Sequence, residues 1–144
     1  MTERRHDGYA ISTDPDRLDL DVIHRWISEE SYWARGRSQE TVAASVRASL
    51  NFGAYAGTGE MVGAARVVTD YATFGWLCDV FVLDGHRGRG LGKALVAAVI
   101  EHPKLADLQR IILATADAHD LYAPHGFDLT ANPERWMERR RPVG

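Results

Sequence analysis

Hydrophobic positions in the first half of the chain follow a helical spacing and then a strand spacing. A weakly alternating run at residues 9–13 predicts a first strand, which ends before Asp14-Pro15-Asp16. Two helices follow, each predicted by apolar residues at helical spacing: the first by Leu18, Val22, Ile23, Trp26 and Ile27, and the second by Val42, Val46 and Leu50. Ser38 is a suitable N-cap for the second helix.

Three apolar runs bounded by turn residues come next. They cover residues 52–56, 61–69 and 73–82, with Thr58-Gly59 at the first turn and Asp70-Tyr71-Ala72 at the second. Short connections of this kind join neighbouring antiparallel strands. The middle of the chain therefore predicts an antiparallel meander.

The second half alternates between helix and strand. A helix is predicted from Gly90 to Glu101, where Pro103 ends it, and a continuous apolar strand at residues 110–115. A short helix at 118–124 and closing strands at 127–130 and 135–139 complete the pattern. A strand, a crossover helix and a second strand imply a local parallel pair between Val82 and Ile111. The predicted fold class is α/β (α+β), a mixed and mostly antiparallel central sheet with helices on both faces.

A glycine-rich turn joins the third meander strand to the helix that begins at Gly90. It reads His86-Arg87-Gly88-Arg89-Gly90-Leu91-Gly92-Lys93. Glycines let a ligand lie against the backbone, and the first amides of a helix favour an anion. A P-loop would need lysine at Leu91, and a dinucleotide fingerprint that starts at Gly88 would need glycine at Lys93. Both of these phosphate-binding patterns fail.

The spacing Arg87-x-x-Gly90-x-Gly92 resembles the acetyl-CoA pyrophosphate loop of the GNAT superfamily of N-acetyltransferases. About 30 residues later, Leu121-Tyr122-x-x-x-Gly126-Phe127 resembles a second segment of that family. The resemblance extends over residues 60–127. It implies the GNAT fold and an enzyme that transfers an acetyl group from acetyl-CoA directly to an amine. The alternative is a GNAT-fold module that binds CoA as a sensor and does not turn over.

The resemblance also implies roles for individual residues. Tyr122 corresponds to the general acid that protonates the leaving CoA thiolate, and Thr115 stands where the family often has an asparagine near the pantetheine. No metal is needed. The expected cofactor contacts are the backbone of Val80, Phe81 and Val82 and the loop residues Arg87, Gly88, Arg89, Gly90, Gly92 and Lys93.

Asp79 lies in the strand before the loop, where family members often carry a carboxylate base. Regular alternation would place Asp79 on the same face as Leu77 and Phe81. A carboxylate among apolar residues is costly unless it is paired or functional. Two interpretations stay open: a catalytic base, and a structural ion pair with Arg66 or Arg47. The neighbouring Cys78 fits a small buried hydrophobe better than an acyl carrier.

The acceptor site is expected in residues 29–37 together with the turn at Asp70 and Tyr71. Carboxylates lie beside aromatic rings there, which favours a small cationic amine, while Arg35 and Arg37 would suit a substrate carboxylate. Small amines, amino acids, antibiotics, peptides and protein lysines all remain compatible. The residues expected to bind the acceptor are Glu30, Tyr32, Trp33 and Tyr71.

Composition narrows the possible partners. The 144 residues fit one domain spanning 1–144, and a net charge of −3 with a pI near 6.0 argues against nucleic-acid binding. No apolar run approaches the roughly 18 residues of a membrane span, and the charged start lacks a signal-peptide core. A single cysteine excludes an internal disulfide. We expect a cytoplasmic protein with no membrane association, and the resemblance allows a homodimer.

Overall fold

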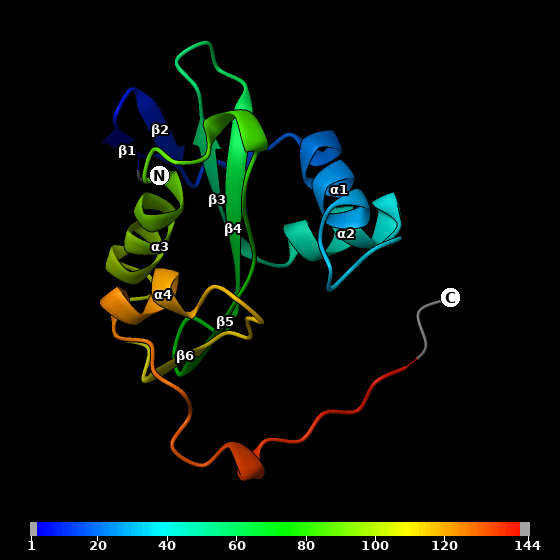
Figure 1. The fold of residues 1–144 in the computed structure, drawn as a ribbon, viewed down its shortest axis with the longest axis vertical. Helices are drawn as coiled ribbons and strands as arrows, with labels where there is room; N and C mark the ends of the chain where they lie inside the picture. Colours follow the sequence, from blue (N-terminus) through cyan, green and yellow to red (C-terminus); the bar gives the residue numbers. More distant parts are fainter. Residues whose placement is uncertain (1–2, 142–144) are drawn as a thin grey trace.

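The computed structural model describes residues 3–141, in which six strands form one sheet (Figure 1). Neighbouring strands in the sheet are also neighbours in the sequence. All pairs are antiparallel except β5 with β6, which confirms the predicted meander and the parallel pair. The strands are β1 Glu3–His6, β2 Tyr9–Ser12, β3 Leu50–Tyr55, β4 Met61–Thr69, β5 Phe74–Val82 and β6 Arg110–Ile112.

Helices cover both faces of the sheet, as the sequence predicted. Figure 1 shows α3 (Leu91–Glu101) and α4 (His119–Tyr122) on one face, and α1 (Leu20–Glu29) and α2 (Gln39–Arg47) on the other. Each face has its own core. Under α3 the core includes Phe52, Val67, Leu77, Leu95 and Val99, and under α1 and α2 it includes Ile23, Ile27, Val42, Tyr55 and Phe81.

Side-chain caps fix where α1 and α2 begin. The Asp19 carboxylate accepts hydrogen bonds from the amides of Asp21 and Val22, and the Ser38 hydroxyl accepts one from the amide of Thr41. These bonds satisfy amides that have no partner inside the helix. Leu50, expected on the apolar stripe of the second helix, instead begins β3, because α2 already ends at Arg47.

Two features of the ends of the chain differ from the sequence predictions. The expected closing strands at 127–130 and 135–139 are absent from the described residues, where only a 3-10 turn at Pro133–Arg135 interrupts an extended tail. A strand forms only where a neighbouring strand pairs with it, and the chain pairs neither segment. At the other end, β1 forms a hairpin with β2 through Asp7-Gly8, both at positive φ.

Within residues 3–141, the helices are all too short or too polar to cross a membrane.

Candidate active site

The site begins where β5 and β6 separate. The last residues that pair between the two strands are Trp76 and Ile112, and β5 continues alone to Val82 while the chain turns from β6 toward α4. The separation leaves an open cleft of about 600 Å³. Its lining includes residues 76–80 of β5, residues 113–115 and 117–118, Leu121 and Tyr122 of α4, and aromatic side chains from α1 and the segment after it.

A bulge in β5 lies at the centre of this cleft. Arg66 pairs with Cys78 but Ala64 pairs with Phe81, so Asp79 and Val80 together oppose one residue of β4. Asp79 has φ +52°, in the left-handed region. The extra residue breaks the alternation predicted for the strand. Leu77 therefore packs in the core under α3, whereas Phe81 packs in the core under α1 and α2, so the expectation that they share a face was wrong.

The carboxylate of Asp79 is buried and is held by three side chains. Arg66 Nε donates to its Oδ2 at 2.9 Å, Trp33 Nε1 donates to its Oδ1 at 3.1 Å, and Arg37 Nη1 lies 3.6 Å from Oδ2. Such partners offset the cost of burying the charge. The geometry favours the structural ion pair over the catalytic base, and it selects Arg66 rather than Arg47 as the partner.

The glycine-rich loop passes from a short 3-10 turn at Asp84–His86 into α3. Gly88 and Gly90 have φ of +78° and +75°, and Gly90 occupies the N-cap position of α3 with no side-chain cap. The first amides of α3 are therefore left available for an anion, which the positive end of the helix dipole also favours. The Arg87 side chain folds back on its own segment, where Nε donates to the carbonyl of Val82 at 3.0 Å and Nη1 pairs with Asp84.

Two residues of the first hairpin support the loop, and sequence reasoning missed both. His6 Nε2 lies 2.8 Å from the carbonyl oxygen of Arg89, and the Tyr9 hydroxyl lies 2.8 Å from His86 Nδ1. Because a carbonyl only accepts, His6 must be the donor in the first of these bonds. In a trans peptide the carbonyl and the next amide point in opposite directions. His6 thus holds the Arg89–Gly90 peptide with the Gly90 amide turned away from the hairpin.

Tyr122 is the last residue of α4 and faces the cleft. The residue is 9% exposed, and its ring packs edge-on against Phe127, with 5.9 Å between ring centroids. Burial raises the pKa of Tyr122 above its ordinary value, and the nearby Tyr32 adds to the shift. Thr115 also lines the cleft, and its hydroxyl oxygen accepts the amide of Ala118, which leaves its own proton free to donate elsewhere.

Aromatic rings form the wall opposite α4. Trp26 stacks on Phe81 with 4.6 Å between centroids, Trp33 lies 5.5 Å from Trp26, and Tyr32 packs edge-on against Trp33. The Tyr32 hydroxyl accepts the amide of Ala116 at 2.9 Å, which ties this wall to the segment after β6. Trp26 was expected only as a helix core residue; it also lines the cleft, and its buried Nε1 has no hydrogen-bond partner within residues 3–141.

The turn between β4 and β5 contributes less than the sequence indicated. Tyr71 lies outside the cleft lining and is near Lys104, with Nζ 5.7 Å from its ring centroid. The Asp70 carboxylate accepts the amides of Ala72, Thr73 and Phe74, and these bonds lower its pKa well below the ordinary value. The structure therefore does not bring Tyr71 into the cleft with the other residues expected to bind the acceptor, and the side chains of Thr69 and Asp70 are used in hydrogen bonds within the turn. Glu30, Tyr32 and Trp33 do line the cleft.

Comparisons with known proteins match this geometry. The family model described as "Acetyltransferase (GNAT) family" matches residues 12–127. The chain belongs to the GNAT family of acetyltransferases. A solved structure from Xanthomonas campestris pv. campestris, described as belonging to the GNAT family, is 46% identical with a TM-score of 0.91 and 96% of each chain covered.

More distant relatives agree. A protein from Gibberella zeae, named as an acetyltransferase, is 32% identical over 133 residues, which cover 79% of this chain and 75% of its own. A structure of a Clostridium acetobutylicum protein with acetyl-CoA is 13% identical with a TM-score of 0.67, covering 92% of this chain and 94% of that one. At that identity the likeness extends to the GNAT fold alone.

Cys78 lines the cleft but is not suited to carry an acyl group. Burial raises the pKa of its thiol to about 12, so it stays protonated and a poor nucleophile at neutral pH.

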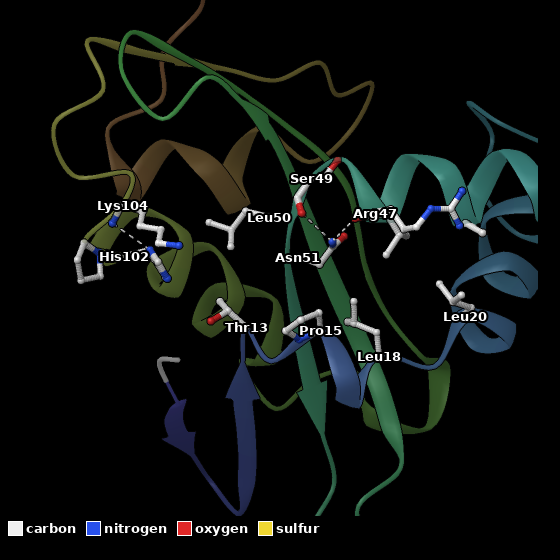
Figure 2. Close-up of a pocket in the computed structure, with 13 residues that line it drawn as sticks. Thr13, Pro15, Leu18, Leu20, Arg47, Ser49, Leu50, Asn51, His102 and Lys104 are labelled. Atoms are coloured by element: carbon white, nitrogen blue, oxygen red, sulfur yellow. Dashed lines mark hydrogen bonds between the residues drawn. The ribbon is translucent and has the colours of Figure 1, made fainter.

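A larger hollow of about 780 Å³ lies between α2, the start of β3 and the end of α3 (Figure 2). None of the candidate site residues lines it. The side-chain amide of Asn51 is used locally, where it donates to the carbonyls of Val46 and Ser49.

Proposed function

We propose that the protein transfers the acetyl group of acetyl-CoA directly to the amine of a small molecule. The observation that carries the proposal is the cleft between the separated ends of β5 and β6. The uncapped start of α3 follows the end of β5, and Tyr122 of the neighbouring α4 lines the cleft. The cleft and the start of α3 would hold an activated thioester, and Tyr122 would supply the proton for its leaving group.

The residues present fit the pyrophosphate and pantetheine of acetyl-CoA. A side chain at Gly88 would meet no atom within 4 Å, so the space beside the loop is open to a ligand. The amides of Gly88, Arg89, Gly90, Gly92 and Lys93 would hold the phosphates. Beyond the point where β5 and β6 separate, every second amide of β5 points away from β4 and is free to bind a ligand. The Leu83 amide donates to the Val62 carbonyl of β4, so by alternation the Phe81 amide also faces β4, and the amides of Val80 and Val82 are the ones that would bind the pantetheine and polarise the thioester carbonyl.

Acetyl-CoA supplies an acetyl group already activated as a thioester. The neutral amine attacks the carbonyl carbon, and the C–S bond then breaks to release a thiolate. Tyr122 gives that sulfur its proton, because a phenol held protonated by burial remains a donor across the neutral range. The amine loses its proton to solvent, since Asp79 is already held by Arg66 and Trp33.

The lining of the cleft favours a small cationic amine as the acceptor. Glu30 provides a carboxylate near the faces of Trp26, Tyr32 and Trp33. Aromatic faces attract a cation by about 0.5–2 kcal/mol. Arg37 also lines the cleft, where it shares the single negative charge of Asp79 with Arg66 and is therefore only partly offset.

Substitutions in this wall test the acceptor site. Glu30→Ala and Trp33→Ala should raise the acceptor KM and leave the affinity for acetyl-CoA unchanged. Glu29→Ala is the matched control, because Glu29 is exposed on α1 and outside the cleft lining. If both cleft variants keep the KM of the parent, the acceptor binds elsewhere.

A screen for thiol release from acetyl-CoA across a library of amines tests the activity itself. An N-acetyltransferase releases CoA with one class of amine well above the rate of hydrolysis, and mass spectrometry finds the N-acetyl product. A CoA sensor would bind CoA in calorimetry and release none with any amine. Transfer to hydroxyl acceptors alone would exclude the proposed nitrogen specificity.

A further inference from the structure

We propose that the hollow shown in Figure 2 is a second ligand site, which binds a small molecule made of an apolar chain and one carboxylate. The inference does not depend on acetyl transfer or on the identity of the acceptor. It rests on the apolar lining of the hollow, on one ring nitrogen of His102 and on the charges around the hollow.

The hollow has the size and the lining of a small-molecule site. Its volume is about 780 Å³, and pockets for small ligands commonly measure about 300–1,000 Å³. Most of its lining residues are apolar, and they come mainly from residues 15–20, from α2 and from the start of β3. Leu18 and Leu50 are only half-buried, and Leu20 is 38% exposed. An apolar chain laid along these side chains would remove their surface from water.

His102 supplies a hydrogen-bond donor at one end of the hollow. The residue is 8% exposed, and its Nδ1 accepts the amide of Lys104 at 3.1 Å. Burial lowers the pKa of His102, so the ring is neutral at neutral pH and carries its proton on the other nitrogen, Nε2. Within residues 3–141, Nε2 has no hydrogen-bond partner. Polar groups of buried residues are normally paired, and an oxygen atom of a ligand would pair this one.

The charges around the hollow select an anion. Among residues 3–141, Arg47 and Lys104 line it and no aspartate or glutamate does. Neither cation forms an ion pair in the part of the chain that the structure describes. The net charge of the chain is −3, so this positive lining runs against the average. A cationic ligand, such as the amine expected in the cleft, would find no opposite charge here.

The positions of these groups also orient the ligand. Figure 2 shows His102 and Lys104 at one end of the hollow and Leu20 at the other, with Leu50 and Leu18 between them. The His102 Nε2 and the Lys104 ammonium would each donate to one oxygen of the carboxylate, and the chain would extend over Leu50 and Leu18. Two donors match the two oxygens of a carboxylate, whereas a phosphate has three strong acceptor oxygens.

The hollow is separate from the active-site cleft. Within the described residues, the two share no lining residue. A ligand in the hollow is therefore held away from the groups that would handle acetyl-CoA, and both molecules can be bound at once. A fatty acid that entered the cleft instead would compete with CoA, so competition distinguishes the two sites.

Titration of the full chain with octanoate, followed by NMR of the backbone amides with and without CoA, tests the proposal. The amides of residues 18–20, 46–51, 102 and 104 should shift and saturate, and CoA should not reverse the shifts. Octanol has the chain without the charge, and acetate has the charge without the chain. Each should bind at least about tenfold more weakly than octanoate, because each lacks one half of the interaction.

Substitutions in the lining test the orientation and the place of the ligand. Lys104→Gln should weaken octanoate binding about tenfold, and Lys104→Arg should keep it, because only the first loses a charge-assisted hydrogen bond. Arg47→Gln should weaken binding less, because Figure 2 shows Arg47 away from the end that holds His102. Ala43→Phe places a ring in the hollow and should abolish binding. Ala44→Phe is the matched control, since Ala44 is exposed on the same helix and outside the lining.

Thermal unfolding of each variant shows whether it is folded, and Lys104 is exposed, so its substitution leaves the core intact. Four results would overturn the proposal: no saturable shift with octanoate, octanol that binds as tightly as octanoate, shifts that CoA reverses, and unchanged affinity in Lys104→Gln. Octyl phosphate that binds more tightly than octanoate would replace the carboxylate by a phosphate and contradict the assigned ligand class.

Discussion

Replacing Tyr122 by phenylalanine removes one oxygen atom and leaves the ring. The ring packs edge-on against Phe127, and its hydroxyl makes no hydrogen bond to the part of the chain that the structure describes. Phenylalanine can keep the packing, and no buried partner loses a bond. The free energy of unfolding should change by less than about 1 kcal/mol, the typical net value of one hydrogen bond.

The effect on catalysis should be much larger. Loss of a positioned general acid typically lowers the rate by about 10²–10⁴-fold. At about 1.36 kcal/mol for each factor of ten, this raises the barrier by roughly 2.7–5.4 kcal/mol. The fall should appear in kcat, while the KM for acetyl-CoA stays close to that of the parent. Because burial raises the pKa of Tyr122 above its ordinary 10.0, the parent should show no loss of rate from its ionisation below pH 10.

Steady-state thiol release, calorimetric CoA binding and thermal unfolding of the same samples check the prediction. Tyr71→Phe is the matched control, since Tyr71 lies outside the cleft lining. A Tyr122→Phe enzyme whose kcat stays within twofold of the parent would show that another group protonates the thiolate. A fall in kcat accompanied by weaker CoA binding and a lower Tm would mean that the hydroxyl has a structural role.

Three further substitutions test other parts of the site and fold. Gly90→Glu should abolish CoA binding in calorimetry, because it adds a negative charge at the loop and its Cβ would lie 3.3 Å from His6. Gly36→Ala controls for backbone strain, because Gly36 also has a positive φ (+79°) and a Cβ there would meet no atom within 4 Å. Asp79→Asn should lower the free energy of unfolding in denaturant by about 3 kcal/mol, because it leaves the Arg66 charge buried without its partner. The acidic limb of the pH–rate profile should persist in this variant. Loss of that limb would show that Asp79 is the catalytic base. Burial lowers the pKa of His102 below 6.5, so the unfolded chain binds the proton more readily and stability should fall as pH drops below about 6.5. His102→Gln should flatten that fall in urea titrations at each pH.

Local patterns in the sequence were enough to predict most of the fold. The meander and the glycine loop follow from residue spacing and turn residues, and Ser38 marks the start of α2. The hairpin of β1 and β2 had a signal too, since Asp-Gly is a preferred two-residue turn. The polar composition of Glu3–His6 hid it.

Other features depend on contacts that no local pattern encodes. The bulge at Asp79 inserts a residue without changing the apolar pattern around it, so alternation assigned Leu77 and Phe81 to one face. Partners distant in sequence decide the state of Asp79, and Arg66, Arg37 and Trp33 come from three different segments. Residues 135–139 have a strand-like pattern, but no strand pairs with them within residues 3–141, and the pattern alone does not supply a partner.

The bulge requires a fixed number of residues in β5, and the residue types along the strand do not reveal this requirement. Two residues of β5 stand opposite one residue of β4 at the bulge, so the side chains after the bulge alternate one residue out of step with those before it. Phe81 therefore points to the core under α1 and α2, where it stacks on Trp26. Replacing Val80 by another apolar residue would alter one packing contact. Deleting Val80 would return β5 to regular pairing and turn its outer residues to the opposite face. We therefore expect libraries of this protein to tolerate many substitutions at position 80 and no single-residue deletion or insertion there.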